Sequence, residues 1–242
     1  MIYNKDCVIG AKDIDDESID LLICDPPFGN ELNMVSFYRR KNNPVIPVYK
    51  EAPDDPELYY QWSKEWLTEA YRILKSNGSI YVVSGWTNAH RVARAAEEVG
   101  FHIRNKIIWH YKFCATTKLK YTTSHYEIFY LCKNTKACPT FNRRYRSSDR
   151  LYYSDIHDVW NISKVFDRGN IEKNKNKLPD ALVAKMIKIS SNEGDLVCDF
   201  FLGNFTTAIV AERMNRECCG FEINEESFKR GMKKILQINK LF

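Results

Sequence analysis

The sequence lacks the features that mark membrane, secreted and metal-binding proteins. None of its apolar runs approaches the ~20 residues that a membrane-spanning helix requires, and the opening MIYNKDCVIG is charged by position 5, unlike a secretory signal. It contains eight cysteines, but no two are spaced as C-x-x-C, and neither His125 nor His157 has companions at metal-ligand spacing. We therefore expect a cytoplasmic protein with reduced thiols, no bound metal and no membrane contact.

The composition is that of a globular protein with one strongly basic segment. Hydrophobic residues make up 44% of the 242 positions and charged residues 28%, and a chain of this length can bury one sizeable core. We predict a single domain over residues 1–242. Residues 110–177 hold 14 Lys and Arg against 6 Asp and Glu, whereas the rest of the chain holds 22 against 25. The basic excess is confined to one segment.

The spacing of the apolar residues predicts alternating strands and helices. Helical spacing over residues 57–75 and 89–99 predicts two helices, and Asn77-Gly78 is expected to stop the first. Residues 128–131 allow one antiparallel strand. The other expected strands include residues 1–7, 21–24, 80–83, 103–109 and 196–201. This order predicts an α/β fold with a doubly wound, mostly parallel sheet.

The stretch LLICDPPFGN at residues 21–30 combines a buried strand with a stiff acidic turn. Asp25 follows the strand, at the edge where open α/β sheets bind ligands. Pro26 and Pro27 fix the backbone and donate no hydrogen bonds, which leaves carbonyl oxygens as acceptors. Two acceptors beside the flat ring of Phe28 suit methylation of an exocyclic amino group on an extruded base. A plain strand terminator would also explain the turn, so this motif alone leaves both interpretations open.

A second motif lies near residue 200. An apolar strand at residues 196–201 leads into Gly203, which suits a tight turn, and Thr206-Thr207 then begins a helix. Phe221-Glu222 ends the next strand, about 20 residues later. A strand, a glycine turn, a helix and a distal acid predict a nucleoside pocket in which the acid accepts hydrogen bonds from ribose hydroxyls.

Two further segments carry arginines that suit nucleic-acid binding. Residues 29–56 are rich in proline and lack sustained periodicity, so they predict a long loop beside the first motif, bearing Arg39 and Arg40. A later segment interleaves aromatic rings with Arg143, Arg144, Arg146 and Arg150. That pattern suits phosphate neutralisation together with base stacking. A solvated basic surface is the alternative.

Together, the two motifs resemble those of the amino-group DNA methyltransferases that use S-adenosylmethionine, in the permuted order in which the catalytic motif comes first. Asp25-Pro26-Pro27-Phe28 is similar to the catalytic tetrad of that family. The segment from Asp199 to Thr207 is similar to its cofactor loop, usually D-P-F-x-G-S-G-T-T, and Phe221-Glu222-Ile223-Asn224 to its ribose-binding segment. The resemblance covers almost the whole chain. It implies a Rossmann-like methyltransferase fold with residues 110–177 as a basic target-recognition insertion.

The resemblance implies a role for each matched residue. Catalysis falls to Asp25, Pro26, Pro27 and Phe28. The residues expected to bind the cofactor are Asp6, Cys7, Asp25, Asp199, Phe200, Phe201, Gly203, Asn204, Thr206, Thr207, Glu222 and Asn224. Those expected to contact DNA are Arg39, Arg40, Arg143, Arg144, Arg146 and Arg150. No metal is implied, and relatives often form homodimers.

Several positions depart from the family pattern. Asn204 and Phe205 stand where the cofactor loop usually has serine and glycine. Leu178 stands where lysine commonly precedes the proline before the next helix. Because a glycine allows the backbone to approach a ligand closely, these changes leave open weak cofactor binding, or a cofactor-impaired nucleic-acid-binding subunit of a methyltransferase complex.

The expected activity is methyl transfer from S-adenosylmethionine to the exocyclic N6 of adenine in DNA. In the family, aspartate in the first tetrad position tends to accompany adenine and serine tends to accompany cytosine, so Asp25 favours adenine. Cytosine N4 is the alternative base, and RNA is a less favoured substrate. Cytosine C5 methylation needs a cysteine nucleophile, typically after proline, and the sequence contains no Pro-Cys pair. The resemblance also suits a role in restriction and modification of DNA.

Overall fold

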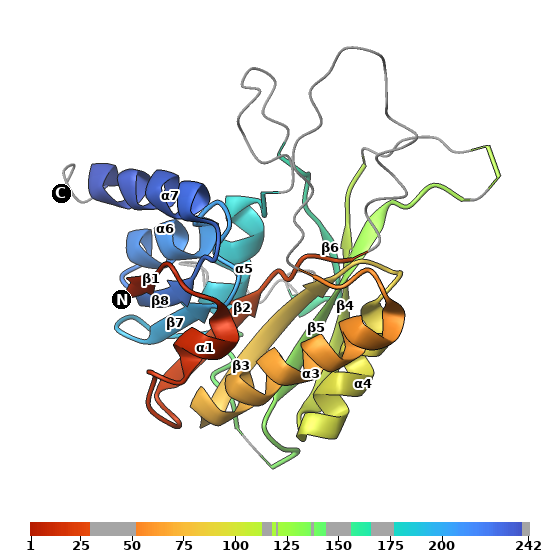
Figure 1. Cartoon of the computed structure of the whole chain (residues 1–242), viewed down its shortest axis with the longest axis horizontal. Coiled ribbons are helices and arrows are strands. Elements are labelled where there is room, and N and C mark those ends of the chain that lie inside the picture. The colour runs from red at the N-terminus through yellow and green to blue at the C-terminus, as the bar shows by residue number, and fades with distance from the viewer. Residues whose placement is uncertain are drawn as a thin grey trace.

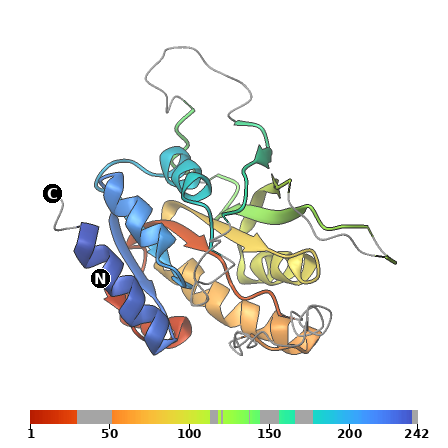
Figure 2. The same ribbon diagram turned by 90° about the horizontal axis from the view of Figure 1, so that it is seen from above.

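The structure is a computed structural model that describes residues 1–29, 52–112, 118–119, 121–136, 138–143, 156–165 and 177–238. In this part of the chain, eight strands form one sheet in the order β1-β8-β7-β2-β3-β5-β4-β6, and helices cover both of its faces (Figures 1 and 2). The strands are β1 (Ile2–Tyr3), β2 (Ile19–Cys24), β3 (Leu74–Ser84), β4 (His102–His110), β5 (His125–Cys132), β6 (Val159–Asn161), β7 (Leu196–Asp199) and β8 (Glu217–Phe221). The helices are α1 (Cys7–Ala11), α3 (Pro56–Ile73), α4 (Ala89–Val99), α5 (Asp180–Ser190), α6 (Thr206–Arg213) and α7 (Glu225–Ile238).

The sheet is parallel except at β5, which runs antiparallel to both β3 and β4. The apolar run at residues 128–131 lies within β5, so the expected antiparallel strand is confirmed. Strand β7 leads through α6 to β8 on one side, while β2 leads through α3 to β3 on the other. This is the doubly wound, mostly parallel sheet that the alternating pattern predicted.

The core consists of separate apolar layers on the two faces of the sheet. Helices α1, α3 and α4 cover one face, where Trp66 and Leu67 are buried, and α5 and α6 cover the other, where Leu182 and Met186 are buried. Residues 21–24 of β2 are fully buried, which explains why that strand shows no polar alternation. A third, smaller cluster lies between α6 and α7. Most of the described cysteines are buried thiols.

The strands that carry the two motifs, β2 and β7, are neighbours in the sheet. Leu22 of β2 pairs with Cys198 of β7 in parallel register. Because the strands are parallel, Asp25 and the turn after Asp199 lie at the same edge. The connection that follows β2 leads to β3 on one side of this pair, and the connection that follows β7 leads to β8 on the other side. Open α/β sheets bind ligands at such a switch point.

Two strands are shorter than the sequence predicted, and in both cases an aspartate redirects the chain. Asp6 caps α1, because its carboxylate accepts the N–H groups of Val8 at 2.9 Å and Ile9 at 3.2 Å. The first strand therefore ends well before residue 7. Asp199 accepts the Phe201 N–H at 2.8 Å, which turns the chain away from the sheet two residues early.

The segment after α3 differs from the prediction. The helix ends at Ile73 and β3 starts at the next residue, so Asn77-Gly78 does not stop the helix. Gly78 lies inside β3, at a shift in register against β2. A Cβ there would lie 2.6 Å from Cδ1 of Leu74 and 2.9 Å from the backbone oxygen of Asp20. The glycine is needed for close packing within the sheet rather than for a turn.

Strand β6 and helix α7 were not predicted. Strand β6, which pairs with β4, has only three residues and is too short to give a periodic signal in the sequence. Helix α7 does carry a signal, since Phe228, Met232 and Ile235 recur at helical spacing and pack on the cluster beneath. Within the described ranges, none of the helices is long and apolar enough to cross a membrane.

Candidate active site

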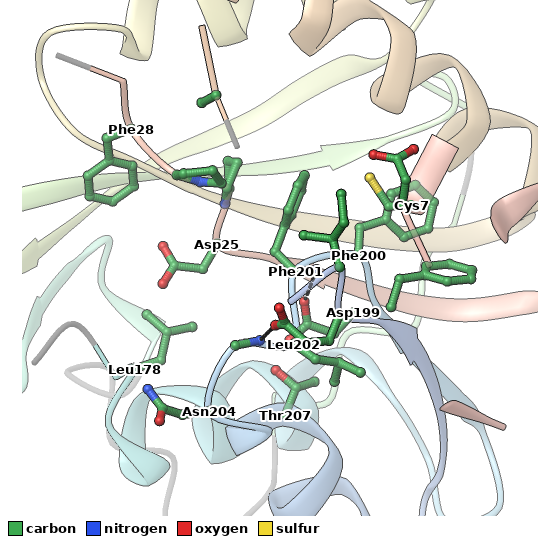
Figure 3. Close-up of a pocket in the computed structure, with 18 of the residues that line it drawn as sticks. Cys7, Asp25, Phe28, Leu178, Asp199, Phe200, Phe201, Leu202, Asn204 and Thr207 are labelled. Carbon is green, nitrogen blue, oxygen red and sulfur yellow. Dashed lines mark hydrogen bonds between the residues drawn. The ribbon is translucent and has the colours of Figure 1, made fainter. Parts of the chain in front are cut away.

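A cavity opens at the carboxyl ends of β2 and β7, where the two motifs meet (Figure 3). Its wall includes all four residues predicted to be catalytic, Asp25, Pro26, Pro27 and Phe28. Of the residues predicted to bind the cofactor, all but Asn224 also line it: Asp6, Cys7, Asp25, Asp199, Phe200, Phe201, Gly203, Asn204, Thr206, Thr207 and Glu222. Figure 3 shows the carboxylate of Asp25 pointing into the space above Leu178 and Asn204. Two motifs far apart in the sequence thus form one site.

Asn224 is exposed to solvent and is not among the residues that line the cavity. Its side-chain oxygen accepts the Ser227 N–H at 2.9 Å and so caps the start of α7. Its own N–H donates to the Glu222 carboxylate at 2.8 Å. Asn224 thus supports both Glu222 and α7, and its contact with the cofactor stays a prediction from the sequence.

Two side chains from neighbouring helices hold the backbone of the catalytic tetrad. The Tyr59 hydroxyl of α3 donates to the Pro27 carbonyl at 3.1 Å, and the Asn88 amide donates to the Phe28 carbonyl at 2.7 Å. Among the described residues, no donor bonds to the carbonyl of Pro26. Within the described part of the chain, the tetrad thus has one backbone acceptor without a donor beside Asp25.

Neither Tyr59 nor Asn88 stands out in the sequence as a functional residue. Tyr59 belongs to the apolar stripe of α3 and is fully buried; burial, and then the charge of Asp25, raise the pKa of its hydroxyl, which remains a proton donor. Asn88 directly precedes α4, where asparagine commonly caps a helix, but it makes no such bond. Its side-chain oxygen instead accepts from Arg91 at 3.0 Å, which orients the amide toward the tetrad.

The ring of Phe28 is held against a cluster of aromatic side chains. The centroid of the Tyr126 ring, on β5, lies 5.1 Å from that of Phe28. The rings of Trp109 and Tyr111 flank Tyr126, with centroids 5.4 Å and 5.3 Å from that of Tyr126. The Lys164 ammonium lies 4.2 Å from the centroid of Tyr126 and 3.8 Å from that of Tyr111, and it donates to the Tyr126 hydroxyl at 2.9 Å. These aromatic and cation–π contacts fix one side of Phe28.

Two buried carboxylates organise the loop after β7. Burial raises the pKa of Asp199 to about 7, and its carboxylate accepts the Phe201 N–H. Glu222 accepts the Gly203 N–H at 2.7 Å with one oxygen and the Asn224 N–H at 2.8 Å with the other. Burial also raises the pKa of Glu222. Each oxygen of Glu222 keeps a further lone pair, so the carboxylate can accept hydrogen bonds from ligand hydroxyls as well.

The residues that depart from the family pattern leave the cavity open. Phe205 adopts φ 64° and ψ 25°, a left-handed conformation that glycine reaches at lower cost. Its side chain is fully buried between α6 and α7 and does not line the cavity. Leu178 is 7% exposed and forms an apolar floor beneath Asp25 (Figure 3). Neither change narrows the site.

Among the described residues that form the wall of the cavity, carboxylates outnumber cations. The acidic wall residues are Asp6, Asp25, Asp54, Asp199 and Glu222. Lys5 and Lys177 also line it. Each is ion-paired at 2.7 Å with an acid outside the wall, Asp13 and Asp180 respectively. A cavity of this charge suits a ligand with a positively charged centre.

Most of the predicted DNA contacts cannot be located on the fold. Arg143 is exposed to solvent. The other five, Arg39, Arg40, Arg144, Arg146 and Arg150, lie outside the described residues. The assignment of residues 110–177 to target recognition stays a prediction from the sequence.

Comparison with known proteins identifies the family of the chain that forms this cavity. A family model described as DNA methylase matches residues 19–233, a range that contains both motifs. The chain belongs to the DNA methylase family. DNA is therefore its substrate class, and the enzymatic character expected from the motifs is confirmed.

Named relatives match this DNA methylase along almost its whole length. The type II methyltransferase M.HpaI of Haemophilus parainfluenzae is 30% identical over 241 residues, covering 96% of this chain and 72% of that protein. The DNA adenine methyltransferase YhdJ of Escherichia coli (strain K12) is 29% identical over 254 residues, covering 97% and 82%. Both alignments extend well beyond the two motifs.

Solved structures share its fold. The PvuII DNA methyltransferase, named as cytosine-N4-specific, superposes with a TM-score of 0.75 at 21% identity, covering 96% of this chain and 84% of that one. A complex of M1.HpyAVI with SAM superposes with a TM-score of 0.65 at 20% identity, covering 97% of each chain. The Rossmann-like methyltransferase fold expected from the sequence is confirmed.

Part of the cavity wall of this DNA methylase carries no sequence signal. Ala52 and Asp54 line the cavity from the segment before α3, and Trp62 lines it from the helix itself. The Trp62 ring packs on that of Phe201 at 5.8 Å. Trp62 follows the apolar spacing of α3, so the sequence alone gives it the appearance of a core residue.

Proposed function

We propose that this DNA methylase transfers the methyl group of S-adenosylmethionine to the exocyclic N6 of adenine in DNA. The observation that carries the proposal is the meeting of Asp25 and the Gly203 loop in one cavity, an amine acceptor beside a nucleoside-binding turn (Figure 3). We also assign the chain to the permuted subgroup with a D-P-P-F tetrad, because Asp25 precedes Gly203 in the sequence. The choice of adenine is supported by the aspartate in the first tetrad position and by 29% identity to a protein named as a DNA adenine methyltransferase.

The wall residues fit S-adenosylmethionine. When bound, this cofactor supplies a methyl group on a positively charged sulfur, and the acidic cavity suits that charge. Glu222 has acceptor capacity left for ribose hydroxyls. Cys7 lies at the side of the cavity away from Asp25, and with Asp6 it would hold the adenine ring (Figure 3). The proposed cofactor site thus extends from the start of α1 to the tetrad.

The tetrad residues act on the target amine. Its lone pair is delocalised into the base, so the nitrogen is a weak nucleophile. The Asp25 carboxylate and the Pro26 carbonyl accept hydrogen bonds from its two N–H groups and hold the nitrogen for in-line attack. The proton that the amine loses on methylation passes to the Asp25 carboxylate and from there to solvent. The ring of Phe28 offers a face on which a base extruded from the duplex can stack. Such positioning can supply ~7 to 11 kcal/mol of the barrier.

The proposal places DNA against the basic segment at residues 110–177 and the loop at residues 29–56. The assigned contacts are Arg39, Arg40, Arg143, Arg144, Arg146 and Arg150. Cations that neutralise phosphates release counterions, so DNA affinity should fall as the salt concentration rises.

Product analysis tests the choice of base. The protein is incubated with S-adenosylmethionine and unmethylated DNA, the DNA is digested to nucleosides, and the nucleosides are resolved by mass spectrometry. N6-methyladenine is the expected product. N4-methylcytosine as the sole product would overturn the adenine assignment, and a chain that binds the cofactor but methylates neither DNA nor a parallel RNA substrate would overturn the proposed reaction.

Replacement of Asp25 tests the tetrad. Asp25→Ala should lower methyl transfer on the order of 100-fold or more, because it removes one of two acceptors at the reacting nitrogen. Cofactor affinity measured by calorimetry should change little, since Glu222 and the loop remain. Asp15→Ala removes an exposed carboxylate away from the cavity and is expected to leave transfer unchanged. Full activity in Asp25→Ala would remove the residue from its proposed role.

A further inference from the structure

We propose that helix α7 is a positioning element of the cofactor site, and that Gly231 is the residue on which this role depends. The helix holds the loop after β7 at three points, although none of its described side chains lines the cavity. This inference rests on the proposed function, since it takes the loop to bind S-adenosylmethionine. Its basis is the departure from glycine at Phe205.

The first point of attachment joins Phe205 to Gly231. A left-handed conformation is unfavourable for a non-glycine residue, so the φ of 64° at Phe205 must be stabilised by its surroundings. The ring is fully buried and lies edge to face with Phe228 of α7, at 6.2 Å between centroids. A Cβ on Gly231 would overlap three atoms of that ring. The helix therefore needs glycine at this position to receive the phenylalanine.

The other two attachments are polar. Asn224 caps α7 and donates to Glu222, and Glu222 in turn accepts the Gly203 N–H at 2.7 Å. One turn beyond Gly231, the Lys234 ammonium donates to the Asn204 carbonyl at 3.3 Å. The start of the helix thus reaches the loop through Glu222, whereas its middle and later turns contact the loop directly.

These attachments control the cavity wall because the loop residues are consecutive. Gly203 and Asn204 line the cavity, and Phe205 follows them directly at the start of α6. If the ring of Phe205 were displaced, its backbone would relax from the left-handed region, and the carbonyl and N–H groups of the two preceding residues would reorient. The position of α7 is in this way transmitted to the ligand without direct contact.

A double-mutant cycle tests the inference. Gly231→Ala places a methyl group in the space of the Phe205 ring and should weaken S-adenosylmethionine binding on the order of tenfold in calorimetry, with a larger effect on KM for the cofactor than on kcat. Phe205→Gly removes the ring and restores a residue that adopts the same φ without strain. In the double variant, cofactor affinity should return to within about threefold of the wild type.

Further variants separate positioning from general stability. Phe101, just before the start of β4, packs on Tyr71 of α3 with 5.0 Å between the ring centroids. Phe101→Leu loosens this contact and should lower thermal stability without changing cofactor affinity. Lys234→Met keeps an exposed side chain but loses the bond to Asn204, and should weaken cofactor binding about threefold. Because Lys234 is exposed, this variant decides the question even if Gly231→Ala does not fold.

The outcomes are distinct. If the wild type binds S-adenosylmethionine while Lys234→Met and folded Gly231→Ala bind it equally well, the inference is wrong and the proposed function stands. An equal loss of affinity in Phe101→Leu would also overturn it, since the effect would then follow stability alone. If the wild type does not bind S-adenosylmethionine, the proposed function fails, and this inference fails with it.

Discussion

In the tetrad Asp25-Pro26-Pro27-Phe28, hydrogen bonds from two distant side chains occupy two of the backbone carbonyl oxygens. Tyr59 and Asn88 lie 32 and 60 positions further along the chain than their acceptors, the carbonyls of Pro27 and Phe28. With those two oxygens occupied, the Pro26 carbonyl, to which none of the described donors bonds, is the acceptor that our proposal assigns to the target amine. The two prolines restrict the backbone of the tetrad, and side chains from α3 and from the start of α4 hold it further in place.

Removal of either donor should slow the reaction without affecting the cofactor. Tyr59→Phe and Asn88→Ala are each expected to lower kcat about 5- to 10-fold, because one lost hydrogen bond costs about 1 kcal/mol and allows the tetrad to shift. Affinity for S-adenosylmethionine should be unchanged, which steady-state kinetics and calorimetry can separate. Tyr60→Phe is the matched control, since the neighbouring hydroxyl bonds to Glu98 away from the tetrad. An equal loss of kcat in the control would contradict the assignment.

At the scale of helices and strands, the sequence predicted those elements whose limits are set locally. Helix α4 ends where expected, because Gly100 adopts φ 111° and terminates it. Asn77-Gly78 looks like a similar stop signal, yet it lies inside β3. Position 78 needs glycine because the backbone of Asp20 in the adjacent strand leaves no space for a side chain. The residues next to Gly78 in the sequence give no sign of that contact.

The same distinction between local and distant determinants applies to the residues of the candidate site. Residues such as Asp25 and Glu222 could be identified because their chemistry and spacing are characteristic of a known reaction. Tyr59 and Asn88 could not, because their partners are backbone atoms of a distant segment and their residue types suit ordinary core and capping positions equally well. The role of Asn224 is ambiguous for a related reason, since a short polar residue beside an acid can cap the next helix as readily as contact a ligand.

The close packing inside β3 gives a prediction at this scale. Gly78→Ala should lower the free energy of unfolding by about 1–3 kcal/mol, because the added methyl group meets Leu74 and the Asp20 backbone. Urea unfolding measures the change, while activity per folded molecule should be retained because the cavity lies at the other end of the strands. Ser76→Ala, an exposed substitution in the same strand, should have almost no effect. Equal destabilisation by both variants would contradict the packing argument.

For the molecule as a whole, Asp199 should make stability depend on pH. Its pKa is about 7 in the folded protein because of burial, and about 3.9 in an unfolded chain. The folded state therefore holds a proton that the unfolded state releases, so this contribution to stability is fully present below about pH 4 and is lost as the pH rises through 7.

The corresponding experiment compares Asp199→Asn, which stays neutral, with the wild type. Between pH 5 and pH 8, the wild type without ligand should lose about 2 to 3 kcal/mol more of its unfolding free energy than the variant does. Urea titrations at the two pH values measure the difference, and groups common to both proteins cancel. Parallel pH dependence in the two proteins would show that Asp199 is already ionised at pH 5.

The pairing of β2 with β7 also determines when during synthesis the protein can become active. The Leu196 N–H and the Asp20 carboxylate that join these strands, at 3.0 Å, are separated by 176 positions. A nascent chain that has emerged only as far as α5 carries Asp25 but has no opposite wall to hold a nucleoside. Methyl transfer therefore has to wait until the segment that carries Gly203 and Glu222 has been synthesised and has paired with the first half of the chain.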